Sequence, residues 1–478
     1  MNSFKRTKIV ATVGPACANK TTLKKMIQAG VDVFRFNMSH GVHDDLRKVY
    51  QYIKEINREL HVHTAVLADL QGPKIRTGEM EENTILKRGK PINIVTKNII
   101  GNYTEFSINY SKLPQEVKKG DMILMDDGKL SVKVESTNKK DRIECKVVQG
   151  GILKSRKGVN FPNTPISMPC LTPKDKKDLE FALELNVEWI ALSFVRTHED
   201  IEELRRIINR RKKKARIIAK IEKPEAIDDI DNIIHSTDAI MVARGDLGIE
   251  VPYQDVPILQ KMMIKKCLKA AKPIIVATQM MESMIENTQP SRADVNDVAN
   301  SVMDGTDAVM LSGETSVGKH PVKVIETMSN IIHKVEQFED IFNPQFLPVF
   351  NEDRVLTDSI CENAVQLADK VNAKAIITMT HSGYSAMKVA SFRPRARIFV
   401  FTNNHSILNT VNLIWGVTGY YYDKFVSTDN TINDLKALLK DSKKVKDDDL
   451  VINITSMPIE NKGKTNTIKL SYINPKLN

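Results

Sequence analysis

Cysteine is scarce in this sequence, long hydrophobic runs are absent, and no segment is of low complexity. The five cysteines are scattered among 478 residues, with no CxxC or other paired spacing. A disulfide framework and a zinc site are therefore not expected, and the composition is typical of the reducing cytoplasm. No apolar run approaches the roughly 18 residues that a membrane-spanning helix needs, so we predict no contact with a membrane.

Aromatic residues are also missing where nucleic-acid binding would require them. The chain carries a formal net charge of +11, and its densest basic run is RRIINRRKKKAR at residues 205–216. This run offers no aromatic ring on which a base could stack. It follows the acidic residues of HEDIEE at 198–203, and acid-first, base-last order complements a helix dipole. We therefore predict a solvated helix end and no nucleic-acid partner, while the positive field suits small anionic substrates.

The chain is too long for one hydrophobic core, and its strand pattern predicts a parallel barrel. Runs rich in β-branched residues alternate with helical periodicity, which is typical of βαβ units. Three such runs precede a turn-rich interruption and five follow it: 8–13, 31–36 and 64–68, then 189–194, 217–221, 239–242, 274–277 and 308–311. Eight alternating strands predict a (β/α)₈ TIM barrel.

Two further units complete the predicted organisation. Residues 72–169 contain short alternating segments separated by glycine-rich turns, which predicts an inserted, antiparallel, all-β lid domain. Residues 350–478 contain a second α/β alternation, with strands expected at 375–379, 398–401, 416–421, 450–454 and 467–470. The barrel would then comprise residues 1–71 and 170–345.

The stretch 216–250 holds the charges that indicate chemistry. Its two apolar runs lead into Lys220 with Glu222 and into Asp246, and one helix is expected between them over 224–234. Because burying an isolated charge is costly, charge at a strand end belongs in the mouth of a barrel, where such folds place their active sites. Glu222 and Asp246 suit Mg²⁺. The alternative is ordinary ion pairing at a solvated loop.

Polar residues follow nearly every predicted barrel strand. A single one carries no information, but a set with both charge signs favours a metal-dependent site for an anionic substrate. The set is Asn37, Ser39, Asp69, Ser193, Lys220, Glu222, Asp246, Thr278, Ser312 and Glu314.

Longer motifs identify a family that this pattern resembles. They run in order through the chain: RFNMSHG (35–41), DLQGPKIRTG (69–78), KGVNFP (157–162), ALSFVR (191–196), AKIEKPEAIDDID (219–231), MVARGDLGIE (241–250), ATQMMESMI (277–285) and LSGETSVGKHP (311–321). Together they closely resemble the pyruvate kinases. These enzymes transfer the phosphoryl group of phosphoenolpyruvate to ADP and form pyruvate and ATP, the last step of glycolysis.

The resemblance implies roles for individual residues. Glu222 and Asp246 would bind Mg²⁺, and Lys220 would stabilise the transferring phosphoryl group. Thr278 would organise the water chain that protonates the enolate. The full substrate and catalytic set would be Arg35, Arg76, Ser193, Lys220, Gly245, Asp246 and Thr278. The nucleotide would meet Asn37, His40, Arg76 and Lys157, the last of these from the closing lid.

The family's monovalent-cation site would be formed here by Asn37, Ser39, Asp69 and the backbone of Leu70. Members that depend on K⁺ resemble Asp-Thr-Lys-Gly-Pro-Glu where this chain reads Asp-Leu-Gln-Gly-Pro-Lys, ending at Lys74. A lysine ammonium is itself a compact positive charge. We therefore predict activity that does not require K⁺, even where the ion can occupy its ligands.

The C-terminal domain is expected to be regulatory. Thr380, Ser382, Gly383 and Ser385 resemble the family's phosphate-binding effector loop, placed at a helix start. Tyr384 departs from the residue types usual there, and Lys462 and Lys464 are expected to lie in a loop that faces it. A surface turn capping a helix is the alternative. The resemblance also implies a homotetramer.

Two other functions stay open on the residues alone. A Mg²⁺-dependent aldolase or lyase acting on pyruvate enolate would need two carboxylates and an arginine, but no lid that carries Lys157. An RNA-binding protein would need aromatic side chains beside the basic run. A coupled assay with phosphoenolpyruvate and ADP separates the three.

Overall fold

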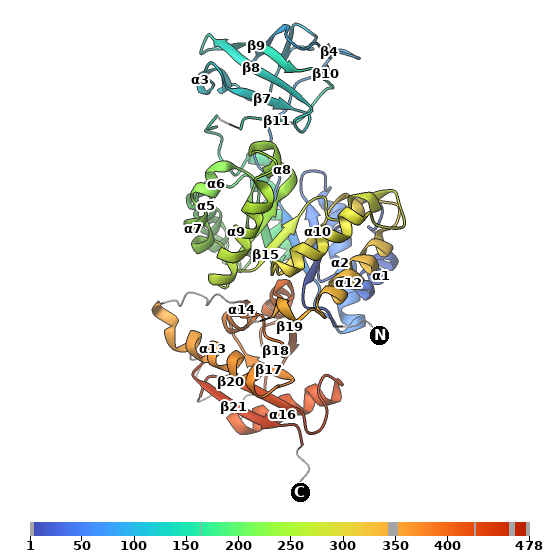
Figure 1. Cartoon of the computed structure of the whole chain (residues 1–478), viewed down its shortest axis with the longest axis vertical. Helices are drawn as coiled ribbons and strands as arrows, with labels where there is room; N and C mark the ends of the chain where they lie inside the picture. The colour runs from blue at the N-terminus through green and yellow to red at the C-terminus, as the bar shows by residue number, and fades with distance from the viewer. Residues whose placement is uncertain (1–3, 163, 343–351, 425–426, 458–463, 475–478) are drawn as a thin grey trace.

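The computed structural model describes residues 4–162, 164–342, 352–424, 427–457 and 464–474. Three bodies follow one another along its long axis, with a small β domain at one end, a barrel in the middle and an α/β domain at the other end (Figure 1). No helix of the described residues is long and apolar enough to cross a membrane.

The barrel is closed by eight parallel strands, as predicted. They are β1 (Lys8–Thr12), β2 (Val33–Asn37), β3 (Ala65–Asp69), β12 (Trp189–Leu192), β13 (Arg216–Ile221), β14 (Ala239–Ala243), β15 (Ile274–Ala277) and β16 (Ala308–Leu311), in the order β1-β16-β15-β14-β13-β12-β3-β2. Alternate residues, such as Val10, Trp189 and Ile218, fill the interior, while their neighbours pack outward against the helices. The strands are apolar throughout because both faces are buried.

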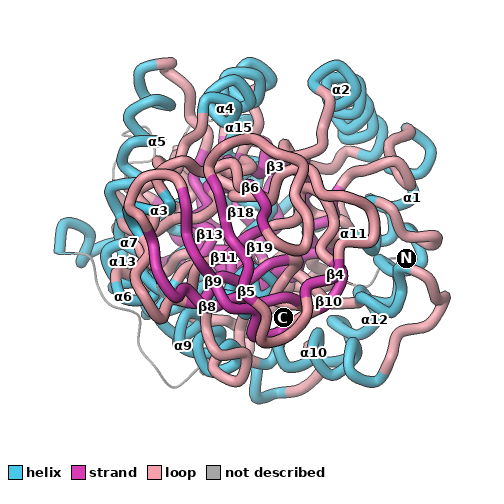
Figure 2. Tube along the Cα trace, turned by 90° about the horizontal axis from the view of Figure 1, so that it is seen from above, coloured by secondary structure: helices cyan, strands magenta, loops and turns pink. Residues whose placement is uncertain are grey.

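Helices surround the strands as an outer ring (Figure 2). They are α1 (Lys20–Ala29), α2 (His43–Leu60), α4 (Pro173–Leu185), α5 (His198–Arg210), α6 (Pro224–Asp228), α7 (Ile230–Ser236), α8 (Arg244–Glu250), α9 (Val256–Lys269), α10 (Arg292–Met303), α11 (Gly313–Ser316) and α12 (Pro321–Val335). The single helix expected over 224–234 was wrong. It breaks at Asp229, whose carboxylate accepts hydrogen bonds from the backbone of His198 and from Asn232.

The inserted domain has its own core, which includes Ile92, Phe106, Val132 and Ile143. It contains β4 (Ile85–Leu86), β5 (Pro91–Val95), β6 (Glu105–Ser107), α3 (Leu113–Glu116), β7 (Met122–Met125), β8 (Leu130–Thr137), β9 (Arg142–Gln149), β10 (Gly151–Ile152) and β11 (Val159–Asn160). A six-stranded sheet runs β11-β7-β8-β9-β5-β6, beside the pair β10-β4. The expectation of a wholly antiparallel domain needs one correction, because β5 and β6 pair in parallel. Parallel neighbours need a connection that crosses back along the sheet, and the segment between β5 and β6 provides it.

The C-terminal domain is a second α/β sheet with the order β19-β18-β17-β20-β21. Its elements are α13 (Val355–Lys370), β17 (Ala375–Met379), α14 (Tyr384–Ser391), β18 (Arg397–Thr402), α15 (His405–Thr410), β19 (Val417–Tyr421), α16 (Thr428–Asp441), β20 (Leu450–Thr455) and β21 (Thr467–Tyr472). The last strand is antiparallel to β20, and the other pairs are parallel.

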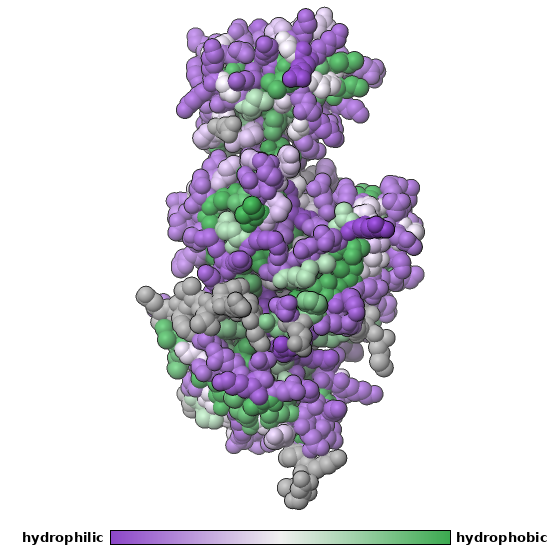
Figure 3. Space-filling model, viewed as in Figure 1, coloured by the Kyte–Doolittle hydropathy of each residue, from purple (hydrophilic) through white to green (hydrophobic). Residues whose placement is uncertain are grey.

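Buried polar contacts join this domain to the N-terminal face of the barrel. Arg393 lies 3.1 Å from Asp307 and donates to the carbonyl of Gly305, and Lys8 donates to the carbonyl of Val417. Over the face shown in Figure 3, hydrophilic side chains predominate and hydrophobic ones gather in patches on the barrel helices and the C-terminal domain. The two domains are therefore docked through paired charges as well as apolar packing.

Candidate active site

A polar cavity of about 150 Å³ opens at the carboxyl ends of the barrel strands, beneath the lid. It is lined by Arg35, Asn37, Ser39, His40, Asp69, Leu70, Gln71, Lys74, Arg76, Ser193, Phe194, Lys220, Glu222 and Asp246. Most of the polar strand-end residues singled out in the sequence therefore meet here. Parallel strands end at one rim of a barrel, and this brings residues far apart in sequence into a single site.

Lys220 lies at the centre of the cavity wall. Its ammonium is 2.9 Å from Glu222, 3.2 Å from Asp69 and 2.7 Å from the hydroxyl of Ser193. Burial disfavours its charged form, but the two carboxylates outweigh burial and raise the pKa of Lys220. The group is thus a permanent positive charge, held in position by three partners.

Glu222 is almost completely buried beside Lys220. One carboxylate oxygen faces the ammonium, and the other accepts a 2.7 Å hydrogen bond from the backbone N–H of Phe194. Burial, followed by repulsion from Asp246, raises the pKa of Glu222 to about 7 despite these partners. Two carboxylates that repel one another across a cavity provide the hard oxygen ligands of a divalent cation, so these residues fit Mg²⁺.

Arg35 and Asp69 line the cavity beside Lys220. The Arg35 Nε lies 2.6 Å from Asp69, and its Nη1 donates to Thr12 on the neighbouring strand. Burial opposes ionisation of Asp69, but Lys220 and Arg35 outweigh it and lower the pKa of this carboxyl. Arg35 and Lys220 therefore present two fixed cations at the cavity, which suits a phosphate group.

The lid side of the site is only partly assembled. Arg76 lines the cavity and donates to the carbonyl of Arg156 on the lid, and Asn37 accepts a hydrogen bond from the backbone of Ser39. Lys157 does not line the cavity, because its ammonium lies 2.8 Å from Asp126 within the lid. Hydrogen bonding to Lys157 lowers the pKa of Asp126.

Thr278 and Gly245 lie next to each other, outside the residues that line this cavity. The backbone N–H of Gly245 donates to the Thr278 hydroxyl at 2.8 Å. Thr278, Gln279 and Phe194 adopt φ angles of 69°, 55° and 56°, a left-handed conformation that is unfavourable for a β-branched or bulky side chain. Such strain concentrates at functional sites, and no sequence pattern predicted it.

Two residues that support the site were given no role from the sequence. Arg244 makes a bidentate contact with Asp297, at 2.6 and 2.7 Å, and donates to the carbonyl of Thr278. Asp175 accepts from the backbone of Gly72 and thereby fixes the chain where it enters the lid. Arg244 directly follows a strand, which was the available signal. The contact of Asp175 depends on tertiary structure alone.

Glu314 and Ser312 do not reach the cavity. The Glu314 carboxylate is fully buried and accepts from the backbone N–H groups of Ser312 and Met281. It therefore holds two loops together. Hydrogen bonding to backbone satisfies this buried charge without a ligand.

The loop before α14 is tightly held. Gly383 has a φ of 82° and donates to the Thr380 hydroxyl at 2.9 Å, and the hydroxyl of Ser385 is buried 3.1 Å from that of Thr378. Arg216, at the start of β13, donates to the carbonyl of Ser382. Lys464 donates to the carbonyl of Asp353, and Lys462 lies outside the described residues.

Comparison with known proteins finds matches along nearly the whole chain. The family model for the pyruvate kinase barrel domain matches residues 4–325, and that for the pyruvate kinase alpha/beta domain matches residues 358–471. The pyruvate kinase of Corynebacterium efficiens is 40% identical over 470 residues, and that of Mycobacterium tuberculosis is 38% identical, each covering 98% of both chains. A crystal structure of a pyruvate kinase from Cryptosporidium parvum superposes with a TM-score of 0.91 at 35% identity, covering 98% of this chain and 96% of that one.

The barrel, its charged mouth and these relatives define a phosphotransferase. More particularly, the chain belongs to the pyruvate kinase family. Its reaction is the transfer of a phosphoryl group from phosphoenolpyruvate to ADP, which yields pyruvate and ATP in glycolysis. The family generally uses Mg²⁺ and K⁺.

Proposed function

We propose that phosphoryl transfer takes place in the cavity around Lys220. The observation that carries this proposal is the position of the Lys220 ammonium, within 3.2 Å of Asp69, Glu222 and Ser193 at the strand ends. In a loose transition state the phosphoryl oxygens carry most of the charge. A cation that is already held in place stabilises that charge without reorganisation.

Glu222 and Asp246 would hold the Mg²⁺ of the reaction. When bound, the ion supplies positive charge to the substrate's carboxylate and phosphate oxygens. Arg35 and Arg76 bind phosphate from the cavity walls, because a guanidinium matches the geometry of phosphate oxygens. Ser193 and the backbone at Gly245 position the substrate.

Thr278 is proposed to act in the proton-transfer half of the reaction. Its hydroxyl accepts from Gly245 and donates to the carbonyl of Ala277 at 2.6 Å, and Arg244 holds its backbone. A hydroxyl in a fixed position can organise the water that delivers a proton to the enolate.

The nucleotide would bind between Asn37 and His40 of the barrel and Arg76 and Lys157 of the lid. Closing the lid would bring Lys157 from Asp126 to the nucleotide phosphates and exclude water. This exchange of partners costs little free energy, because the Lys157–Asp126 pair is partly exposed and therefore weak.

Activity is proposed not to require K⁺. Lys74 lines the same cavity as Asn37, Ser39, Asp69 and Leu70, the residues that would form the monovalent-cation site. Its ammonium would supply the charge that the ion supplies in K⁺-dependent relatives. The test is turnover in buffer free of sodium and potassium, with tetramethylammonium holding the ionic strength. A many-fold gain on adding K⁺ would contradict the proposal, and Lys74→Glu with Leu70→Thr and Gln71→Lys should create the dependence.

The domain of residues 350–478 is proposed to be regulatory, with Thr380, Ser382, Gly383 and Ser385 binding a phosphorylated effector. Contact of this loop with Arg216 supports coupling to the barrel, because β13 carries Lys220 near its other end.

A homotetramer in the cytoplasm is proposed as well, and the 82% exposure of Tyr253 and 69% exposure of Ile258 support an apolar subunit interface. Light scattering tests the assembly, and titration with sugar phosphates and AMP tests the effector loop.

A coupled assay tests the central proposal. Production of pyruvate should require phosphoenolpyruvate, ADP and Mg²⁺ together. An aldolase or lyase would act without a nucleotide, so cleavage or condensation of pyruvate adducts in the absence of ADP would overturn the assignment.

A further inference from the structure

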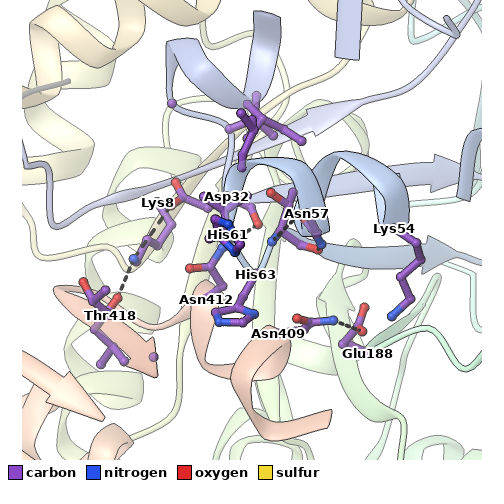
Figure 4. Close-up of a pocket in the computed structure, with 18 of the residues that line it drawn as sticks. Lys8, Asp32, Lys54, Asn57, His61, His63, Glu188, Asn409, Asn412 and Thr418 are labelled. Carbon is purple, nitrogen blue, oxygen red and sulfur yellow. Dashed lines mark hydrogen bonds and ion pairs between the residues drawn. The ribbon is translucent and has the colours of Figure 1, made fainter. Parts of the chain in front are cut away.

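A second, much larger cavity lies on the opposite face of the barrel from the active site. This interdomain cleft, of about 1850 Å³, separates the N-terminal ends of the barrel strands from the C-terminal domain. Asp32, Lys54, His63 and Glu188 line it from the barrel side, and Asn409 reaches in from α15 (Figure 4). The residues of the active site and of the loop at 380–385 do not line it.

The interdomain cleft is strongly cationic. Nine lysine and arginine side chains line it, against three carboxylates. Three of the nine are the consecutive lysines 212–214, which belong to the basic run of the sequence. A concave surface with one predominant sign of charge concentrates ligands of the opposite sign.

The three carboxylates have partners of their own and offset only part of this excess. Asp32 pairs with Lys5 and lies 3.7 Å from Lys8. Glu188 accepts from the backbone N–H of Val66 at 2.8 Å and from Asn409 at 2.7 Å. The third, Glu326, lies 3.5 Å from Lys323. Three carboxylates can balance at most three of the nine cations, so the cleft keeps a net positive charge.

Lys54 and His63 define the most favourable position for an anion. Within the described residues Lys54 has no ion pair, and its ammonium lies 5.4 Å from the centre of the Tyr50 ring. Burial, followed by the positive charges of His405 and Lys54, lowers the pKa of His63. His405 comes from α15 and stacks on Tyr421, with ring centres 4.2 Å apart. Basic groups from two domains thus face one space, in which Glu188 is the carboxylate that acts on Lys54.

We propose that the interdomain cleft binds a small phosphorylated anion, which Lys54 and His63 hold from the barrel and His405 holds from the C-terminal domain. A phosphate dianion matches the excess of positive charge better than a single carboxylate does. It also favours the protonated imidazole, so His63 takes up a proton as the anion binds. Because its ligands come from both domains, the anion stabilises their docking.

Calorimetry and thermal unfolding of the full chain test this proposal. The probes are inorganic phosphate, glycerol 3-phosphate and tripolyphosphate, which distinguish the free ion, a monoester and a polyphosphate. At least one of them should bind and raise the melting temperature. The binding enthalpy should differ between buffers of different ionisation enthalpy, because His63 takes up a proton.

Variants locate the site. Lys54→Met should weaken binding roughly tenfold or more, since it removes a charged contact. Lys48→Met is the matched control, because this lysine lies on the same helix but is 70% exposed and outside the cleft. Lys220→Met and Ser382→Glu should leave binding intact, which separates the cleft from the other anion sites. His63→Gln provides a second test and should abolish the proton uptake.

Specific outcomes would overturn the proposal. It fails when none of the three probes shifts the melting temperature or produces heat. It also fails when Lys48→Met weakens binding as much as Lys54→Met, because the effect would then be general surface charge. Loss of binding in Lys220→Met, with retention in His63→Gln, would place the anion in the active site instead.

Discussion

Replacement of Lys220 by methionine is the most informative perturbation of the active site. Methionine keeps much of the apolar stem of lysine but removes the ammonium, which contacts Asp69, Glu222 and Ser193. The reaction loses a cation that is aligned before the transition state forms. A preorganised group of this kind contributes on the order of 2.7–4 kcal/mol, so turnover should fall by about 10²- to 10³-fold.

The same substitution should also lower stability. Glu222 and Asp69 are 1% and 2% exposed, and removing one member of a buried ion pair typically costs about 3–5 kcal/mol. Arg35 still compensates Asp69 at 2.6 Å, so most of this loss falls on Glu222. Mg²⁺ should therefore recover part of the lost stability, because it would neutralise the unpaired Glu222 carboxylate.

Three measurements separate the catalytic effect from the structural one. Turnover is followed in the coupled assay, and unfolding is followed in urea with Mg²⁺ and with EDTA. Lys388→Met is the matched control, because Lys388 pairs with Asp358 at 3.0 Å in an equally buried position of the C-terminal domain. It should lose stability but keep turnover without effectors within a few-fold. A folded Lys220→Met enzyme with near-normal turnover would refute the role of Lys220.

Three further perturbations test other parts of the site. Asp246→Asn should weaken Mg²⁺ activation by roughly tenfold or more, because it removes ligand charge. Its melting temperature in EDTA should change little. Equal Mg²⁺ titration curves for the variant and the unsubstituted chain would count against this role of Asp246. Lys157→Met should raise the KM for ADP several-fold and barely change stability, because its pair with Asp126 is partly exposed; an unchanged KM would remove Lys157 from the nucleotide site. Hydrogen bonding to Asp229 raises the pKa of His198, so its NMR titration midpoint should lie above 6.5 and return toward that value in Asp229→Asn. Protonated His198 therefore adds to the free energy of unfolding at low pH, and this contribution is lost as the pH rises through its folded-state pKa.

The sequence by itself determined the eight barrel strands and most of the polar residues that line the cavity at their ends. Buried parallel strands appear as short β-branched runs, which depend only on local composition. Lys220, Glu222, Asp69 and Ser193 were identifiable because a charged or polar residue directly at the end of such a run is unusual. Strand direction then brings these residues to one rim without further information.

Tertiary structure alone decided which polar residues line the cavity around Lys220 and which lie outside it. Glu314 and Thr278 follow barrel strands, whereas Asp69 ends one; backbone N–H groups enclose Glu314, and the Thr278 hydroxyl accepts from Gly245 outside the residues that line the cavity. Lys157 carries the expected charge, but Asp126, 31 residues earlier, holds it within the lid. The interdomain cleft arises from segments far apart in the chain. Burial and pairing depend on neighbours from distant segments of the chain, and local periodicity carries no information about those neighbours.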